Sequence, residues 1–129
     1  MENTKLDNLR YTKEHEWAMR EGAELLIGIT QFAVDQLGDI TLVNTDVREG
    51  DAVTAGKAFG TVESVKTLSD LYAPVSGTIT RVNIQLESKP ELINEDCYGS
   101  GWMVAILPSD AQAVDQLLSK ADYDLLTTP

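Results

Sequence analysis

Most of the chain consists of short apolar or alternating stretches separated by turn residues, a pattern typical of β-strands. Residues 24–29 and 102–107 are mostly apolar, and both are expected to be strands, the second one buried. Residues 59–65 and 67–72 supply β-branched and aromatic side chains on either side of Lys66. The two stretches predict a hairpin with Lys66 at its tip and the ammonium group in water.

Two other stretches have the features of helices. Residues 31–37 follow Thr30, a favourable N-cap, and precede a glycine that favours termination, so they predict a helix of about two turns. Residues 109–120 begin with a capping box formed by Ser109 and Gln112 and place apolar residues on one face. This second stretch predicts an amphipathic C-terminal helix.

An internal repeat relates the two halves of the chain. Residues 38–44 (GDITLVN) recur 39 positions later as 77–83 (GTITRVN), and five of the seven positions are identical. Each half is expected to form short strands broken by turn residues, at 48–51 in the first half and at 87–90 in the second. Neither half could cover its own apolar face, so the halves should pack together about a pseudo-two-fold axis. The expected parts of this single, mainly β domain (1–129) are an N-terminal extension (1–20), two half-repeats (about 38–65 and 77–107) and a helical tail (109–126).

Composition narrows the range of functions. The 129 residues can bury a core, and the net charge of −11 argues against binding to nucleic acid or to anionic membranes, which requires a basic face. A lone cysteine, Cys97, fits a reducing compartment, and neither a secretory leader nor a membrane-spanning run is recognisable in the sequence. We therefore expect a cytoplasmic location and a monomer.

Motifs for catalysis are missing from the sequence. There is no nucleophile elbow, P-loop, dinucleotide fingerprint or CxxC pair, and His15 is the only histidine. A lone histidine beside a tryptophan is more often a packing or hydrogen-bonding residue than a metal ligand or a general base. The protein is therefore not expected to be an enzyme by itself, and its distinctive feature is a displayed lysine on a two-fold β body.

Several long motifs resemble, in the right order, those of the glycine cleavage H-protein family. The resemblance extends over about residues 9–126. The matching segments are 13–17 (KEHEW), 28–30 (GIT), 36–40 (QLGDI), 62–66 (VESVK), 69–77 (SDLYAPVSG), 90–96 (PELINED), 98–99 (YG) and 101–102 (GW). The chain departs from the family pattern at 44–48, which is one residue longer, at Cys97, where proline is usual, and at 67–68, where a smaller pair is usual.

The resemblance implies a lipoyl/biotinyl-type barrel-sandwich hybrid with lipoate attached covalently to Lys66 as N6-lipoyllysine, and with Glu63 contributing to recognition by the lipoylating enzyme. Such an arm has about ten bonds and reaches roughly 12–15 Å. It also implies a carrier role in the glycine cleavage system. A pyridoxal-phosphate glycine decarboxylase loads an aminomethyl group, a tetrahydrofolate-dependent aminomethyltransferase removes it, and dihydrolipoyl dehydrogenase reoxidises the carrier. A lipoate ligase or a lipoyl or octanoyl transferase is the remaining expected partner.

The loaded carrier needs acidic groups, because a protonated aminomethyl amine held near the body favours a carboxylate in a partly desolvated cleft. Glu16 and Asp70 lie in matching motifs and are the candidates for this cleft. Either could instead be an ordinary solvated acid, and Asp70 could simply stabilise its turn.

Three other functions remain open at this point. An H-like protein could act as a relay that donates lipoyl groups to 2-oxo acid dehydrogenases. A biotin carrier shares the fold but usually has methionines beside its lysine, whereas Val65 and Thr67 flank Lys66 here. An interaction module with an unmodified Lys66 is the third alternative.

Overall fold

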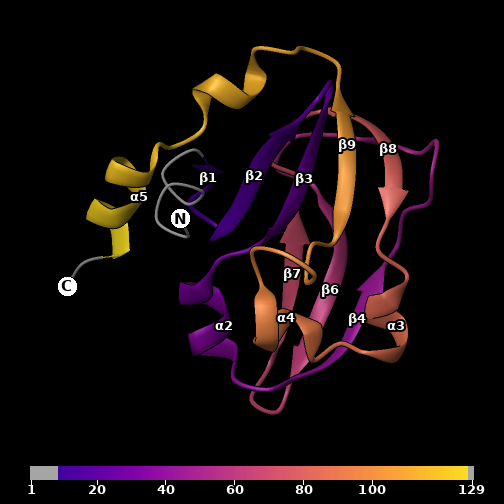
Figure 1. The fold of residues 1–129 in the computed structure, drawn as a ribbon, viewed down its shortest axis with the longest axis vertical. Helices are drawn as coiled ribbons and strands as arrows, with labels where there is room; N and C mark the ends of the chain where they lie inside the picture. Colours follow the sequence, from indigo (N-terminus) through magenta and orange to yellow (C-terminus); the bar gives the residue numbers. More distant parts are fainter. Residues whose placement is uncertain (1–8, 128–129) are drawn as a thin grey trace.

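The computed structural model describes residues 9–127, and the main elements of that part of the chain are two antiparallel β-sheets (Figure 1). The larger sheet has six strands in the order β1-β2-β3-β9-β8-β5, and the smaller has three in the order β4-β6-β7. The expectation of a mainly β protein is confirmed. The strands are β1 (Arg10–Tyr11), β2 (Glu16–Glu21), β3 (Glu24–Ile29), β4 (Ile40–Thr45), β5 (Ala52–Val53), β6 (Ala58–Ser64), β7 (Leu68–Tyr72), β8 (Gly77–Val82) and β9 (Val104–Pro108).

The predicted short helix is present with the predicted ends. Helix α2 (Gln31–Leu37) begins after Thr30, whose side-chain oxygen accepts a hydrogen bond from the backbone N–H of Ala33 at 3.3 Å. It ends at Gly38, whose φ of 77° is readily adopted by glycine. The local sequence was sufficient here because both ends of the helix are determined by single residues.

The C-terminal helix exists, but the prediction that it covers 109–120 is wrong. A 3-10 turn, η1 (Ala113–Gln116), comes first, and helix α5 (Lys120–Thr127) follows. Between them Leu118 is extended, because it exchanges two backbone hydrogen bonds with Tyr11, each of 2.8 Å. Pairing with β1 therefore overrides the helical spacing of apolar residues in this segment.

The second half-repeat also departs from the prediction. Instead of strands broken by a turn at 87–90, it contains two short helices, α3 (Gln85–Ser88) and α4 (Leu92–Asp96). Leu86 of α3, Ile93 of α4 and Cys97 at the end of α4 are buried in the core cluster, so this segment covers one end of the core. Neither helix has a side-chain cap, so the sequence offered little local sign of them.

The repeat extends to the details of strand pairing. The register of β4 against β6 shifts between Ile40 and Leu42, and that of β8 against β9 shifts between Ile79 and Arg81, 39 positions later. At the first bulge the Thr41 hydroxyl donates to the backbone oxygen of Glu63 at 3.2 Å. At the second, the Thr80 hydroxyl donates to the backbone oxygen of Ala105 at 3.3 Å. Glu63 and Ala105 therefore occupy equivalent places in the two sheets.

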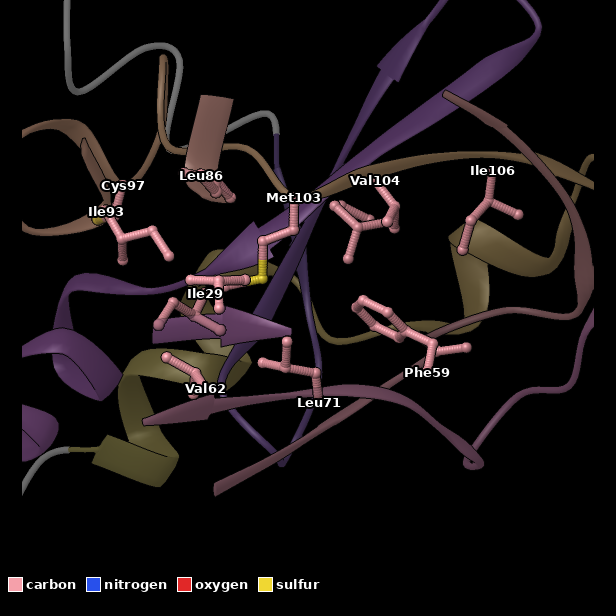
Figure 2. Packing of buried hydrophobic residues seen from close by; sticks show 14 of the residues in the cluster. Ile29, Phe59, Val62, Leu71, Leu86, Ile93, Cys97, Met103, Val104 and Ile106 are labelled. Carbon is pink, nitrogen blue, oxygen red and sulfur yellow. The ribbon is translucent and has the colours of Figure 1, made fainter. Parts of the chain in front are cut away.

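The two sheets enclose a common core. Phe59, Val62 and Leu71 of the smaller sheet pack with Met103 and Ile106, and all five are at most 1% exposed (Figure 2). Burial of this apolar surface on both sheets is the main term that stabilises such a fold.

A second apolar cluster covers the outer face of the larger sheet. Its buried members are Leu9, Tyr11, Trp17, Leu26, Ala105 and Tyr123. Tyr123 of α5 stacks on Tyr11 of β1 with ring centroids 4.6 Å apart. The terminal segments of the described chain therefore cover this sheet from outside.

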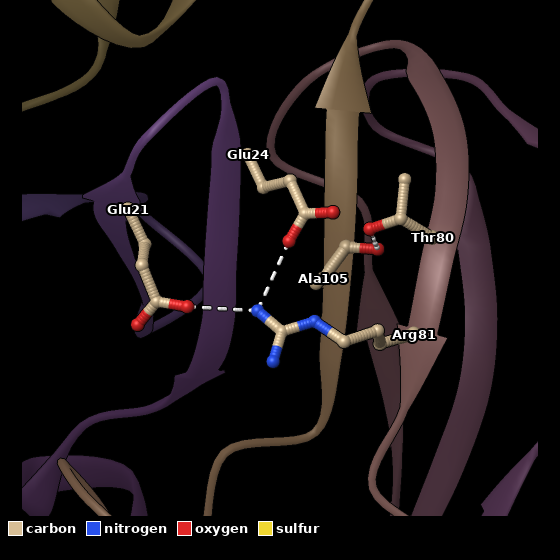
Figure 3. A network of polar contacts seen from close by, with 5 residues as sticks. All are labelled: Glu21, Glu24, Thr80, Arg81 and Ala105. Atoms are coloured by element: carbon tan, nitrogen blue, oxygen red, sulfur yellow. Dashed lines mark hydrogen bonds and ion pairs between the residues drawn. The ribbon is translucent and has the colours of Figure 1, made fainter.

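The exposed edge of that cluster carries an ion-pair network. The Arg81 guanidinium donates to Glu21 at 2.8 Å and to Glu24 at 3.0 Å (Figure 3), and it lies 5.4 Å from the ring centroid of Trp102. All three charged side chains are partly exposed, so each pair is worth little by itself. The network nevertheless ties β8 to the β2–β3 hairpin.

Candidate functional site

Lys66 lies in the tight turn between β6 and β7, and its side chain is exposed. The turn is closed by a 2.8 Å bond from the Ser64 N–H to the Thr67 carbonyl oxygen. The Ser64 hydroxyl oxygen also accepts from the N–H groups of Lys66 and Thr67, both at 3.2 Å. Ser64 thus fixes the backbone on which Lys66 is presented.

The hairpin tip is attached to the rest of the molecule. The N–H of Val65 donates to the carbonyl oxygen of Asp39 at 3.0 Å, which joins the tip to the segment between α2 and β4. The Lys66 stem passes Gly38, where an added Cβ would lie 3.4 Å from the Lys66 Cε. The lysine therefore projects from a fixed turn at the C-terminal end of α2.

A hollow of about 290 Å³ lies between α2 and the start of β7. We call it the hairpin hollow. Its lining residues are Glu14, His15, Ala33, Gln36, Leu37, Thr67, Leu68 and Ser69. Thr67 immediately follows Lys66, so the hollow is within reach of a group attached to this lysine. Five of the eight lining residues belong to the motifs at 13–17, 36–40 and 69–77, but the sequence did not show that these motifs meet at one hollow.

His15 forms part of the wall of the hollow through an uncommon backbone conformation. Its φ is 68°, in the left-handed region. Its ring lies 4.6 Å from that of Phe32, and its Nδ1 is 2.8 Å from the Tyr123 hydroxyl. Burial lowers the His15 pKa, which favours the neutral ring. The packing and hydrogen-bonding interpretation of this lone histidine agrees with these contacts.

The same tyrosine connects the wall of the hollow to α2. The Tyr123 hydroxyl is 2.7 Å from the Thr30 hydroxyl, and Thr30 caps the helix that forms the opposite side of the hollow. Tyr123 is 5% exposed and comes from α5. The C-terminal helix therefore supports both walls of the hollow through one hydroxyl group.

Glu16 is 2% exposed, and each oxygen of its carboxyl group accepts one hydrogen bond. The N–H of Tyr72 donates to one oxygen at 2.9 Å, and the Thr12 hydroxyl donates to the other at 3.0 Å. Burial raises the Glu16 pKa to about 7, even though both hydrogen bonds act in the opposite direction. Glu16 is therefore poised between its neutral and charged forms near neutral pH.

Asp70 is exposed on β7 and is connected to Glu16 through Tyr72. The Tyr72 hydroxyl lies 3.5 Å from Asp70, while the Tyr72 N–H bonds Glu16. The charge on Asp70 is the largest cause of a raised Tyr72 pKa, and Glu14 and Glu16 add to it. The structure thus gathers Glu14, Glu16 and Asp70 around one tyrosine, although of these three only Glu14 lines the hairpin hollow.

Glu63 is exposed on β6, three residues before Lys66. It lies opposite Leu42 on one side and opposite Leu68 on the other. Within residues 9–127 its carboxylate forms no ion pair. The candidate recognition residue therefore lies between two leucines on the open face of the smaller sheet.

Other parts of the described chain offer few alternatives. A larger hollow of about 540 Å³ is lined by residues including Val47, Arg48 and Ile84, and it contains no residue of the Lys66 turn. Residues 9–127 show no cluster of His, Cys, Asp or Glu suited to a metal ion. None of the helices in that range is long and apolar enough to cross a membrane.

Comparison with known proteins gives a consistent match. The family model described as "Glycine cleavage H-protein" matches residues 9–128. A "Glycine cleavage system H protein" of Anaeromyxobacter sp. (strain K) is 50% identical over 118 residues, or 91% of each chain. A protein of that description from Bacillus cereus (strain AH820) is 50% identical over 121 residues, or 94% of each chain. The crystal structure of a glycine cleavage system H protein from Mycobacterium marinum superposes with a TM-score of 0.81 and 40% identity, covering 92% of this chain and 94% of that one.

Proposed function

The chain belongs to the glycine cleavage H-protein family, and on this premise we propose that it is a carrier whose lipoyl group is attached to Lys66. The observation that carries the proposal is the position of Lys66, exposed in a fixed turn next to the hairpin hollow. In this proposal the carrier itself catalyses no step. It passes an aminomethyl group from a pyridoxal-phosphate glycine decarboxylase to a tetrahydrofolate-dependent aminomethyltransferase, and dihydrolipoyl dehydrogenase reoxidises it.

The residues around Lys66 suit an acylated lysine. Amide formation removes the lysine charge, and no buried partner within residues 9–127 is left unpaired by that loss, because Lys66 forms no ion pair there. When bound, a lipoyl group supplies a dithiolane that can accept the aminomethyl group and two electrons. The chain supplies a rigid attachment point in the Ser64 turn and an adjoining hollow with both apolar and polar walls.

The acids near the hollow suit a cationic cargo. A protonated amine near Glu14, Glu16 and Asp70 would be attracted by their charge, and it would favour the ionised form of Glu16. Neutral His15 would add no opposing charge to the wall. We propose that these residues shield the cargo from water between partners, with Glu14 joining the two acids expected from the sequence. The cytoplasmic location expected from the sequence stays a prediction.

The test of the attachment site is peptide mapping and intact-mass measurement of the protein purified from its native cell. We expect one lipoyl group, on Lys66, and none on Lys57 or Lys89, which are also exposed. Lys66→Arg should keep the fold and abolish lipoylation and carrier activity in a reconstituted assay. Lipoate on either of the other lysines, or carrier activity in the arginine variant, would refute the assignment.

The test of the shielding residues is the lifetime of the loaded carrier without partners. Glu14→Gln, Glu16→Ala and Asp70→Ala should each leave lipoylation intact and speed loss of the cargo. If all three variants keep the parent lifetime, these acids do not protect the cargo.

A further inference from the structure

One polar side chain in the wall of the hairpin hollow is held through both its backbone and its ring. The N–H of His15 donates to the Thr12 carbonyl oxygen at 3.1 Å, and the His15 carbonyl oxygen accepts from the Thr30 N–H at 3.0 Å. The His15 ring packs 4.6 Å from that of Phe32 and lies edge-on to that of Tyr123. These contacts from distant segments hold the imidazole in one orientation.

Thr30, Tyr123 and His15 form a chain of polar atoms, which we call the hydroxyl relay. The Tyr123 hydroxyl lies 2.7 Å from the Thr30 hydroxyl and 2.8 Å from Nδ1 of His15. Thr30 is 0% exposed, and its hydroxyl oxygen already accepts from the Ala33 N–H. Within residues 9–127 the Thr30 hydroxyl has one acceptor for its own proton, the Tyr123 oxygen. The Tyr123 proton is then directed to Nδ1 of His15.

The opposite order of protons would leave a buried donor without an acceptor. If Nδ1 of His15 carried a proton, it would donate to Tyr123, and the Tyr123 proton would point to Thr30. The Thr30 proton would then have no acceptor, which is costly in a fully buried hydroxyl group. Burial also lowers the His15 pKa and so favours the neutral ring. The relay therefore places the single ring proton of neutral His15 on Nε2.

Nε2 of His15 is available for a bond to another group. It has no partner within residues 9–127, and no buried side-chain nitrogen or oxygen in that range lacks one, so Nε2 is accessible. The accessible part of the His15 side chain lines the hairpin hollow. The hydroxyl groups of Thr67 and Ser69, in the same wall, donate instead to the backbone oxygen of the next residue. The wall therefore contains a fixed N–H donor that the protein itself does not use.

Resting on the proposed function, we propose that the hydroxyl relay directs the Nε2–H of His15 into the hollow, where it donates to an acceptor of the arm on Lys66. A lipoyl arm has two kinds of acceptor, the amide carbonyl oxygen and the sulfurs, and is otherwise apolar. An N–H donor suits the arm itself, whereas the Glu14 carboxylate in the same wall suits a cationic cargo. His15 binds the arm, and Tyr123 is a positioning residue that acts through His15.

Nitrogen NMR tests the relay without ambiguity, because His15 is the only histidine of the chain. At about pH 8 the unmodified, 15N-labelled protein should show a protonated Nε2 and an unprotonated Nδ1. Tyr123→Phe keeps the ring but removes the donor to Nδ1, so part of the signal should shift to the Nδ1–H form. Tyr98→Phe is the matched control, because its hydroxyl accepts from the Gln31 N–H at 2.9 Å, at the start of the same helix, without contacting His15. The Tyr98 variant should keep the parent tautomer.

The contact with the arm is tested after a purified lipoate ligase and ATP have attached either lipoate or octanoate, which has no sulfur. Intact mass and peptide mapping establish complete modification of Lys66. Exchange of the Nε2–H proton with water should slow about 2- to 10-fold in the lipoylated protein, the range expected for one net hydrogen bond. Equal slowing with octanoate identifies the amide oxygen as the acceptor, and slowing with lipoate alone identifies the sulfurs. The effect should be smaller in Tyr123→Phe.

Each part of the proposal has its own contrary result. A proton on Nδ1 in the parent protein, or a Tyr123→Phe variant with the parent tautomer, would overturn the relay. An exchange rate that neither arm changes would overturn the contact with the arm and leave the proposed function standing. If the ligase does not modify Lys66, the proposed function fails, as the intact mass shows directly, and the contact with the arm fails with it.

Discussion

Replacing Glu16 by glutamine should stabilise the protein at and above neutral pH and have little effect in acid. Glu16 is 2% exposed and its pKa is raised to about 7, so the folded protein disfavours its charged form. Glutamine has the shape of the protonated acid. Its carbonyl oxygen can accept from the Tyr72 N–H, and its amide can donate to the Thr12 hydroxyl oxygen. The variant therefore keeps both contacts and loses only the cost of the buried charge.

The size and sign of the effect follow from the pKa difference. The rise from 4.5 to about 7 is roughly 2.5 pH units, which corresponds to about 3 kcal/mol at 1.36 kcal/mol per unit. Below pH 4.5 the carboxyl is protonated in both the folded and the unfolded chain, so its stabilising contribution is fully present. As pH rises from 4.5 through 7 the unfolded chain loses this proton first, and the free energy of unfolding falls. Above pH 7 the whole penalty applies.

Urea unfolding at a series of pH values between 4.5 and 8.5 measures this effect. The difference in free energy of unfolding between Glu16→Gln and the parent should grow with pH and level off above about pH 7.5. Other titrating groups largely cancel in this difference, including His15, whose lowered pKa makes stability fall in acid instead. Glu14→Gln removes an exposed carboxylate two positions away and should change stability by less than about 0.5 kcal/mol. A difference that does not change with pH would show that Glu16 is not held in its neutral form by burial.

Three further predictions concern the supports of the site and the core. Tyr123→Phe removes the hydroxyl next to His15 and Thr30 and should lower the free energy of unfolding by about 1–2 kcal/mol in urea titrations, whereas an unchanged midpoint would contradict a supporting role. Gly28→Ala should lower the free energy of unfolding by about 1–3 kcal/mol, because the added Cβ would lie 2.5 Å from the indole of Trp17. The indole is held in place by a 2.9 Å hydrogen bond from its N–H to the Cys97 carbonyl oxygen. An unfolding temperature equal to that of the parent in calorimetry would mean that the indole can move. Burial raises the Cys97 pKa to about 12, so iodoacetamide at pH 8 should label this thiol only after unfolding, and rapid labelling of the folded protein would be the opposite result.

Parts of the fold determined by local chemistry were predictable from the sequence. Thr30 and Gly38 bound α2, and a lysine between two strand-like stretches predicted the β6–β7 hairpin. The C-terminal segment was placed wrongly because Leu118 pairs with Tyr11, more than 100 positions away, and no local pattern reports that pairing.

In the candidate site, the residues of the hairpin were predictable from the sequence, whereas the contacts between distant segments were not. Lys66 and Glu63 lie where a hairpin must put them, since their positions depend on strand register. The Glu16 pKa depends on burial and on a hydrogen bond from Tyr72, 56 positions away, and the wall formed by His15 depends on Tyr123 of the terminal helix. Such contacts between distant segments are determined by tertiary packing, so the sequence alone could name Glu16 and Asp70 as candidates but not the contacts that connect them.

The order of the strands has a consequence for how the chain acquires its structure. All three strands of the smaller sheet lie within residues 40–72. In the larger sheet, β3 pairs with β9, which begins only at Val104. Contacts close in sequence form faster than distant ones, and synthesis delivers the N-terminal part first. We therefore expect the lysine hairpin to be paired on the ribosome before β9 has emerged. Until then the inner face of its sheet, with Phe59, Val62 and Leu71, lacks the part of the core that Met103 and Ile106 supply, so a chain stopped before β9 should display its lysine on an aggregation-prone intermediate.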